Sequence, residues 1–188
     1  MTTDSLAGLV WRRLDRDEID LIWRIDRREV IERIYELRAG RLMLCDAFFD
    51  MQGWPPGERE HSMPWLEESF DRGAVFLGVF HGPDIVGIMV LDTLRLGPRR
   101  DLLQLSFLHV GRDYRGRGLG TALFEEATRV ARGLGAQGLY VSATPSERTV
   151  GFYLARGCRP IAVPDPVLFE REPEDIHFEC RFGAPPAP

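Results

Sequence analysis

Arginine and glycine alternate over residues 115–120, in the run Arg115-Gly116-Arg117-Gly118-Leu119-Gly120. The glycines leave the backbone bare, so consecutive N–H groups can point at a phosphorylated ligand. A helix that starts here adds its unpaired N–H groups and partial positive charge. Arg115 and Arg117 add formal charge. The stretch therefore predicts a binding site for a pyrophosphate.

The elements around this loop are those that would hold it in place. The apolar run of residues 102–110 before it predicts a buried strand. After it, apolar residues recur at spacings of four, four, three and four, which predicts an amphipathic helix that ends at Gly133 and Gly135. These apolar positions are Leu119, Leu123, Ala127, Val130 and Leu134.

Three kinds of nucleotide site use such a loop. A P-loop needs a lysine after its last glycine, and none stands there. A dinucleotide fingerprint needs its third glycine one residue later, where Thr121 stands. The pattern Arg/Gln-x-x-Gly-x-Gly/Ala does fit residues 115–120, and it resembles the acetyl-CoA signature of the GNAT N-acetyltransferase superfamily. The resemblance implies acetyl-CoA as cofactor.

A second motif supports this resemblance. Family members commonly carry Asn, then Phe-Tyr-x-x-x-Gly-Phe, on the helix after the fifth strand. Here Tyr153 and Gly157 match, while Ser146 stands in place of Asn and Cys158 in place of the aromatic residue. The resemblance implies that Ser146, which can still donate one hydrogen bond, and Tyr153 contact the cofactor. It also implies that Tyr153 is the general acid.

The resemblance further implies where the pantetheine arm binds. In the family it inserts where the fourth and fifth strands splay apart and pairs with the exposed strand edge. A backbone N–H near Leu108 would polarise the thioester carbonyl. The implied cofactor-binding residues are Leu108, His109, Val110, Arg115, Gly116, Arg117, Gly118, Leu119, Gly120, Thr121, Ser146 and Tyr153.

Amide formation from a thioester needs a proton for the leaving thiolate and a neutral amine. The thiolate has a solution pKa of roughly 8.5 and a phenol one of about 10, so Tyr153 is a credible proton donor. Histone-type members place a glutamate eleven residues before their loop motif, where Gln104 stands here and takes no proton. His109 is the candidate base, acting through water. Weaker candidates are Asp46, His81 and Asp92.

Length and composition set wider limits. With 188 residues, 44% of them hydrophobic, the chain predicts one domain over residues 1–182. A net charge of −5 disfavours a nucleic-acid partner. The tail of residues 183–188, rich in proline and alanine, is expected to be disordered.

The cysteines and the N-terminus predict the location. Cys45, Cys158 and Cys180 are odd in number and widely spaced, which predicts reduced thiols in a cytoplasmic protein. No signal peptide is apparent, and Ala74–Phe80 is too short to cross a bilayer. Histidines and cysteines do not fall at metal-ligand spacing, so no metal site is expected. No cysteine occupies a position suited to a covalent intermediate, which favours direct transfer.

The remaining elements predict an α/β fold, with a mixed sheet of about six or seven mostly antiparallel strands flanked by helices. The resemblance adds that the fourth and fifth strands are parallel and splayed. A capping box at Asp15 and Glu18 opens a helix through Trp23, and a second capping box, Thr144-Pro145-Ser146-Glu147, opens a helix to Arg156. A further helix spans Pro64–Asp71, and the other predicted strands are Leu9–Leu14, Ala74–Phe80, Ile85–Leu94, Gly138–Ala143, Ile161–Phe169 and Ile176–Phe182.

Residues 29–47 are predicted to form an additional β-hairpin with Gly40 in its turn, and a helix over Glu29–Leu37 is the alternative. Residues 52–57, with two prolines and two glycines, must form a loop. Both segments lie where the family varies to hold different acceptors. The exposed edges of the hairpin also favour a homodimer.

The function that these residues predict is direct transfer of the acetyl group of acetyl-CoA to a primary amine of a small molecule or a peptide. An acidic chain suits a cationic acceptor such as a polyamine, an aminoglycoside or a lysine side chain. The alternative is a regulatory module that binds CoA but is catalytically idle. The absence of the glutamate favours this alternative. A general nucleotide-binding regulator is a third reading, which the loop spacing disfavours.

Overall fold

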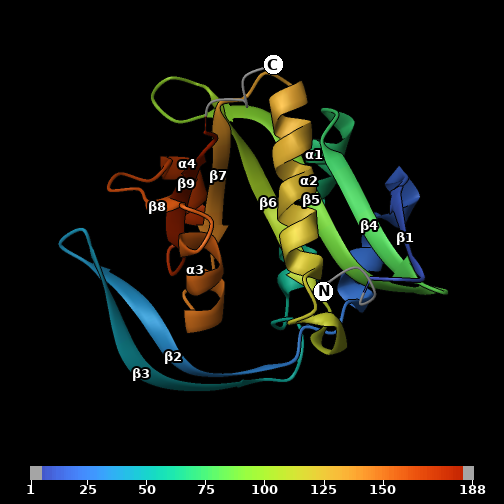
Figure 1. Cartoon of the computed structure of the whole chain (residues 1–188), viewed down its shortest axis with the longest axis horizontal. Helices are drawn as coiled ribbons and strands as arrows, with labels where there is room; N and C mark the ends of the chain where they lie inside the picture. The colour runs from blue at the N-terminus through green and yellow to red at the C-terminus, as the bar shows by residue number, and fades with distance from the viewer. Residues whose placement is uncertain (1–5, 184–188) are drawn as a thin grey trace. The chain divides into compact units, whose positions relative to one another are not determined.

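The computed structural model describes residues 6–183 (Figure 1). Its strands are β1 (Leu9–Arg13), β2 (Glu29–Arg38), β3 (Arg41–Met51), β4 (Val75–His81), β5 (Asp84–Leu96), β6 (Leu102–Val110), β7 (Gly138–Ala143), β8 (Arg159–Pro160) and β9 (Ile176–Arg181). Its α-helices are α1 (Glu58–Asp71), α2 (Leu119–Gly133), α3 (Glu147–Leu154) and α4 (Pro166–Arg171). Two 3-10 helices are η1 (Arg16–Arg24) and η2 (Arg112–Tyr114).

The strands form one seven-stranded sheet in the order β1-β4-β5-β6-β7-β9-β8 and a separate two-stranded sheet, β2-β3. The seven-stranded sheet is mostly antiparallel, and its parallel pair joins Leu102–Gln104 of β6 to Gly138–Tyr140 of β7. The predicted fold class, a mixed α/β sheet flanked by helices, is confirmed. The strands that the sequence predicts as fourth and fifth are β6 and β7.

The described residues divide into two compact units. The first comprises the chain up to Glu29 with residues 50–93 and 105–129, and the second comprises residues 30–49, 94–104 and the chain from 130 onwards. Each unit is described by itself below. A single domain over residues 1–182 stays a prediction, and residues 184–188 of the predicted tail lie outside the described part of the chain.

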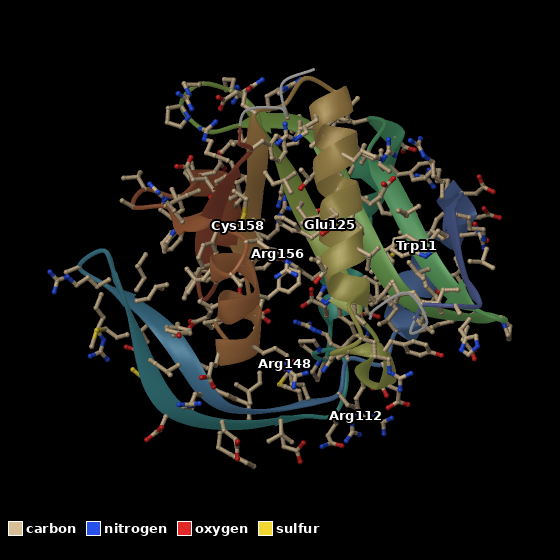
Figure 2. All side chains as sticks on the ribbon, viewed as in Figure 1. Trp11, Arg112, Glu125, Arg148, Arg156 and Cys158 are labelled. Atoms are coloured by element: carbon tan, nitrogen blue, oxygen red, sulfur yellow. A yellow bond between two sulfur atoms is a disulfide. The ribbon has the colours of Figure 1, made fainter. Side chains whose placement is uncertain are left out.

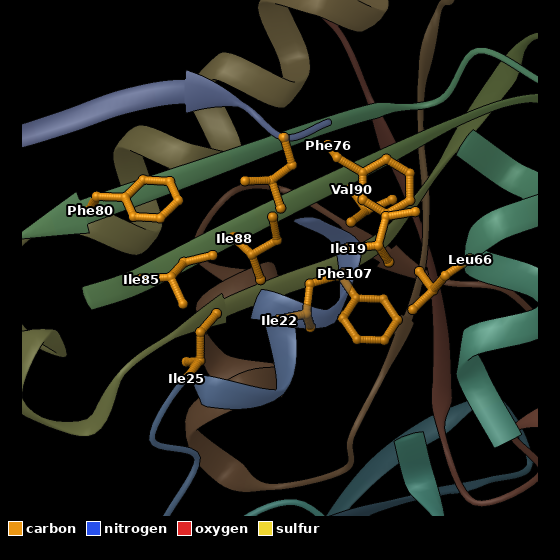
Figure 3. Close-up of a cluster of buried hydrophobic side chains, with 11 residues drawn as sticks. Ile19, Ile22, Ile25, Leu66, Phe76, Phe80, Ile85, Ile88, Val90 and Phe107 are labelled. Carbon is orange, nitrogen blue, oxygen red and sulfur yellow. The ribbon is translucent and has the colours of Figure 1, made fainter. Parts of the chain in front are cut away.

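The first unit has a core that joins η1 and α1 to strands β4, β5 and β6 (Figure 3). Its buried side chains are Leu14, Ile19, Ile22, Ile25, Leu66, Phe76, Phe80, Ile85, Ile88, Val90 and Phe107. Helix α2 approaches β5 closely at Gly87, where an added Cβ would lie 3.3 Å from both Leu119 and Leu123. The missing side chain thus lets the start of α2 pack directly on the strand.

The second unit is organised around the antiparallel pair β7 and β9. Leu96, Leu102, Tyr140 and Leu168 form a small buried cluster in it. Cys158 (labelled in Figure 2) and Cys180 form a disulfide that joins the residue after the α3 turn to β9. The prediction that these two cysteines are reduced thiols is therefore wrong, and Cys45 is the free cysteine of the described residues.

The hairpin prediction for residues 29–47 is confirmed, and the helix alternative is wrong. Strands β2 and β3 run side by side as a curved two-stranded ribbon (Figure 1). The hairpin extends beyond the predicted end, to Met51. Its turn residues Ala39 and Gly40 have φ angles of +48° and +75°. Positive φ at both central residues is what a two-residue turn needs to match the twist of its strands.

Four other predictions need correction. Residues 16–24 form a 3-10 helix rather than an α-helix, although the Asp15–Glu18 capping box is present. Helix α1 starts at Glu58 rather than at Pro64. The proline therefore lies inside the helix, where it removes one N–H···O bond without ending the helix. The cap of α3 is Ser146, not Thr144.

The strand predicted over Ile161–Phe169 is the fourth error. In this part of the chain the strand is the short β8, Arg159–Pro160, which pairs with β9, and α4 begins at Pro166. The side chain of Asp165 accepts hydrogen bonds from the N–H groups of Val167 and Leu168, and a proline follows it at the first helical position. Both features start a helix.

Candidate functional site

The glycine loop lies between η2 and α2 in the first unit. Gly116 and Gly118 have φ angles of +73° and +87°, in the left-handed region that favours glycine. Residues 116–118 are exposed, and a Cβ added at Gly116 or Gly118 would meet nothing within 4 Å. The N–H of Ala122 bonds to the carbonyl of Gly118, so helix α2 starts at once. Its first turn holds no acidic residue. The loop therefore offers open space to an anion beside a helix N-terminus.

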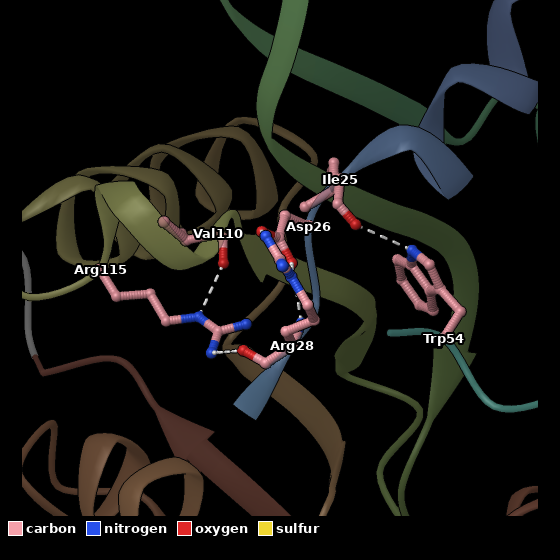
Figure 4. A network of polar contacts seen from close by, with 6 residues as sticks. All are labelled: Ile25, Asp26, Arg28, Trp54, Val110 and Arg115. Atoms are coloured by element: carbon pink, nitrogen blue, oxygen red, sulfur yellow. Dashed lines mark hydrogen bonds and ion pairs between the residues drawn. The ribbon is translucent and has the colours of Figure 1, made fainter. Parts of the chain in front are cut away.

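Arg115 bonds to backbone carbonyls outside the glycine loop. Its Nε donates to the carbonyl of Val110 at 2.9 Å and its guanidinium donates to the carbonyl of Arg28 at 3.0 Å (Figure 4). It also lies 3.6 Å from the carboxylate of Glu29. Arg115 thus ties the end of β6 to the start of β2. A direct contact between Arg115 and a pyrophosphate stays a prediction.

Arg117 differs from Arg115 in its surroundings. It is exposed, and its guanidinium carbon lies 5.8 Å from the centre of the Tyr114 ring. Of the two loop arginines it is the one placed among the exposed residues of the loop. Its positive charge is therefore the better candidate to meet a ligand phosphate.

His109, near the end of β6, packs between two aromatic rings. The ring centres of Trp54 and Phe107 lie 4.8 and 5.2 Å from that of His109, both edge-on. Burial, and then the positive charges of Arg27 and Arg115, hold the pKa of His109 well below its usual range. The imidazole is therefore neutral at physiological pH and free to accept a proton, but its lowered pKa makes it a weaker base than in water.

Trp54 comes from the loop of residues 52–57, and its Nε1 donates to the carbonyl of Ile25 at 3.1 Å (Figure 4). The guanidinium carbon of Arg27 lies 4.9 Å from the Trp54 ring centre. Trp23 packs edge-on against Trp54 at 4.8 Å. The partners of Trp54 and Arg115 were missed by sequence reasoning because backbone carbonyls are acceptors that leave no signal in residue type.

Ser146 and Tyr153 belong to the second unit. Ser146 is buried and caps α3, and its Oγ accepts from the N–H of Thr149 at 3.2 Å. The same hydroxyl donates to Thr149 Oγ1 at 2.9 Å. Its one O–H donor is therefore used within the chain. A contact between Ser146 and the cofactor stays a prediction.

Tyr153 is buried and stacks on Phe178, with 6.0 Å between the ring centres. Burial raises the pKa of its phenol above the ordinary value. The phenol therefore keeps its proton throughout the neutral range, as a general acid must. A raised pKa also makes transfer of that proton to a thiolate less favourable than in water.

The structure brings together, in the first unit, the end of β6 with Leu108, His109 and Val110 and the loop with its helix start at residues 115–121. Ser146 and Tyr153 lie in the second unit.

The other candidate bases either contact neighbouring side chains or lie exposed. Asp92 is buried beside Ser69 and Arg72, as described below. The residues 6–183 contain no cluster of three or more metal-ligating side chains and no helix long and apolar enough to span a membrane.

The remaining two candidates lie on other elements. His81, at the end of β4, has its Nδ1 2.6 Å from the hydroxyl of Tyr114. Asp46 is exposed on β3.

Several solved structures are similar to this chain. A nourseothricin acetyltransferase superposes with a TM-score of 0.67 at 16% identity, over 93% of this chain and 99% of that one. A protein of Bacillus anthracis str. Ames assigned as a streptothricin acetyltransferase, in complex with acetyl coenzyme A, gives 0.68 at 16% identity and the same coverage. The PaiA N-acetyltransferase of Thermoplasma acidophilum, in complex with coenzyme A, gives 0.61 at 16%, again over 93% and 99%.

These likenesses establish the fold. No curated protein matches the chain significantly. The model of the acetyltransferase (GNAT) family matches residues 41–158, which include β6, the glycine loop and α2, together with α3 and Tyr153. With more than half of its residues matched and the sheet, loop and helix of the fold in place, the chain belongs to the acetyltransferase (GNAT) family.

Proposed function

We propose that the protein transfers the acetyl group of acetyl-CoA directly to a primary amine of a small molecule or a peptide. As a member of the acetyltransferase family, the chain takes acetyl-CoA as its acyl donor. The observation that carries the proposal is the glycine loop, in which Gly116 and Gly118 hold left-handed conformations beside open space. That arrangement fits a pyrophosphate bound by backbone N–H groups.

The chain's own groups would divide the work of binding. The N–H groups of residues 116–121 and the charge of Arg117 would hold the pyrophosphate. The backbone edge of Leu108, His109 and Val110 would hold the pantetheine arm, and an N–H near Leu108 would polarise the thioester carbonyl. Bound acetyl-CoA supplies the activated acyl group. Ser146 would be a further residue that contacts the cofactor.

Proton transfer is assigned to two residues. Tyr153 protonates the leaving thiolate, since its buried phenol carries a proton at neutral pH. His109 takes a proton from the amine through water, since its imidazole is neutral. Cys158 and Cys180 are joined in a disulfide and so offer no thiolate nucleophile. This supports direct transfer over a covalent acyl-enzyme.

The acceptor is proposed to be a cationic amine, because the chain carries a net charge of −5. A polyamine, an aminoglycoside and a lysine peptide represent that class, and nourseothricin is added because a neighbouring structure is a nourseothricin acetyltransferase. We place the protein in the cytoplasm as part of the proposal, although a disulfide is uncommon there. The proposed reaction involves no nucleic-acid partner.

The experiment measures thermal unfolding with acetyl-CoA, CoA, ATP or NAD, followed by thiol release from acetyl-CoA with each acceptor. A ligand at about a hundredfold its Kd adds about 2.7 kcal/mol and raises the midpoint by several degrees. The sequence contains no lysine, so no lysine side chain of the protein competes with the added amine. We expect stabilisation by acetyl-CoA and CoA alone, and turnover with at least one acceptor. A shift with ATP or NAD instead would overturn the proposal.

A second candidate function is a catalytically idle module that binds CoA. Gln104, where histone-type members carry their glutamate, favours it, and Gln104 is buried. Stabilisation by acetyl-CoA without thiol release across the acceptor panel is the result that this candidate predicts.

A further inference from the structure

The outer edge of β3 is the longest open strand edge of the hairpin. Strand β2 pairs with β3 on one side. On its other side, β2 meets the start of α3: the N–H of Tyr35 donates to the carbonyl of Pro145 at 2.7 Å, and Ile34 forms a bridge with Ser146. No strand of the residues 6–183 pairs with the far side of β3. Eleven residues of extended backbone are thus left with one unpaired edge.

The turn fixes which backbone groups of β3 point outward. In a two-residue hairpin the flanking residues, Arg38 and Arg41, form a hydrogen-bonded pair, and such pairs recur at every second residue. The N–H and C=O groups of the odd-numbered residues of β3 therefore face β2, and those of the even-numbered ones face outward. The outward N–H of Tyr35 on β2 agrees with this phase. The outward-facing residues of β3 are Leu42, Leu44, Asp46, Phe48 and Asp50.

The hairpin also exposes apolar side chains that a partner would cover. It carries six of the thirteen large hydrophobic residues that are exposed within the described part of the chain, and Phe48 is 72% exposed. The six are Val30, Leu37, Met43, Leu44, Phe48 and Phe49. A hairpin of two strands is marginally stable alone. Edge strands are usually protected from pairing by charged residues, proline or bulges. Strand β3 contains no proline, and its charged residues are Arg41, Asp46 and Asp50.

We propose that β3 pairs antiparallel with β3 of a second copy of the chain, forming a four-stranded sheet across a two-fold axis. An isologous interface of this kind satisfies both open edges and closes the assembly at two copies. This assembly makes no use of the acetyl-transfer residues, so its test is separate from that of the proposed function.

The side chains of β3 select the register of this pairing. A two-fold axis perpendicular to the sheet lies midway between the two strands, at the level of one residue that faces its own copy. An axis at Asp46 would place two carboxylates directly opposite, which is destabilising. An axis at Cys45 instead places Leu42 opposite Phe48 of the second copy, so that the most exposed phenylalanine is covered in both copies, and places Leu44 opposite Asp46. We assign the axis to Cys45.

The first test measures the mass of the full chain by sedimentation velocity over a range of concentrations. We expect twice the chain mass of 21.4 kDa. Phe48→Glu should yield a monomer, since the charge would face Leu42 of the second copy while leaving the fold intact at an exposed position. The control is Val163→Glu, at a site that is 84% exposed outside the hairpin, and it should stay dimeric. A monomeric wild type, or a dimer that survives Phe48→Glu, would overturn the proposal.

The second test reads the register through Cys45, the free cysteine among the described residues. Cys45 faces its copy at a pair without hydrogen bonds, where Cα atoms lie about 4.5 Å apart, within reach of a disulfide. Diamide should oxidise the two thiols to one interchain S–S bond, with both hydrogens passing to the reagent, and give a dimer on a non-reducing gel. Cys45→Ser should abolish that band. A wild-type dimer that does not cross-link would overturn the assigned register.

Discussion

Arg115 donates from its Nε to the carbonyl oxygen of Val110, 2.9 Å away, and so closes the turn of residues 111–114 from one end to the other. The bond joins the first residue of the glycine motif to the last residue of β6. The first arginine of the motif therefore holds the shape of the loop through backbone contacts.

The two arginines should respond differently to replacement. Arg117→Ala should weaken acetyl-CoA binding, and the loss should shrink at high salt, because a solvent-exposed charge is screened. Arg115→Ala should weaken binding at all salt concentrations and lower the free energy of unfolding by about 1.5–3 kcal/mol, because charged hydrogen bonds to partly buried groups are lost. Calorimetric titration at low and high salt, with urea unfolding, separates the two. Equal salt dependence in both variants would contradict this assignment.

Tyr153→Phe removes the proposed acid and keeps the ring that stacks on Phe178. We expect kcat to fall by about 10²- to 10⁴-fold, the usual contribution of a general acid, with little change in the KM for acetyl-CoA. Tyr140→Phe is the matched control, since Tyr140 is another buried tyrosine of the second unit, with its pKa raised to about 12 by burial. It should keep kcat. Steady-state kinetics decides, and a Tyr153→Phe enzyme with unchanged kcat would remove the residue from the mechanism.

His109 should make the protein less stable in mild acid. Its native pKa is lowered, first by burial and then by Arg27 and Arg115, while in the unfolded chain it binds a proton below about pH 6.5. The unfolded state thus takes up more protons, and the free energy of unfolding falls as the pH drops from 6.5 towards the native pKa. The slope approaches about 1.4 kcal/mol per pH unit for one histidine.

His177, whose pKa burial also lowers, adds a second contribution of the same sign. His109→Gln should therefore remove the contribution of one titrating histidine to the pH dependence of the free energy of unfolding. The contribution of His177 should remain. Urea unfolding at several pH values between neutrality and mild acid measures this. If the variant shows the wild-type slope, His109 is not the titrating group.

Asp92 anchors α1 to β5 in the first unit. Its buried carboxylate accepts from Ser69 Oγ at 2.7 Å and from Arg72 at 2.9 Å. Asp92→Ala should lower the free energy of unfolding by about 3 kcal/mol, near the lower end for breaking a buried pair, because Arg72 is partly exposed and also bonds to Glu68. Glu68→Ala is the control on the same arginine and should cost less than about 1 kcal/mol. Equal losses in the two variants would mean that burial does not matter here.

The Cys158–Cys180 disulfide should stabilise the second unit. It joins residues 22 apart in sequence, and the chain-entropy relation gives about 3 kcal/mol for a loop of that size. We expect reduction, or the double change to serine, to lower the urea midpoint accordingly. Cys45→Ser should leave the midpoint unchanged. A reduced protein as stable as the oxidised one would contradict the expectation.

The sequence predicts best where several local signals agree. Strand β6 is predicted to the residue, because a mostly apolar stretch of nine residues ends at a glycine-rich turn. The left-handed loop glycines and the start of α2 follow from the same stretch. The hairpin is predicted because Gly40 lies between two stretches that carry apolar residues.

The errors occur where local signals conflict or where the partner is distant. The apolar residues Val163, Val167 and Phe169 suggest a strand, but their side chains are 84%, 63% and 48% exposed. The N-cap at Asp165 instead starts a helix. An odd cysteine count suggests reduced thiols, yet two of the three are brought together by the pairing of β8 with β9.

The direction of the Arg115 side chain is a further case. It depends on backbone carbonyls, at Val110 and Arg28, that every residue type carries. No pattern of side chains could have predicted it.

The disulfide has a topological consequence. Residues 158–180 form a covalent ring that contains α4 and the exposed Val163. A single cut in the backbone of this ring opens it without dividing the molecule in two. Under oxidising conditions, β9 would thus stay tethered to the rest of the chain even after proteolysis at this surface segment.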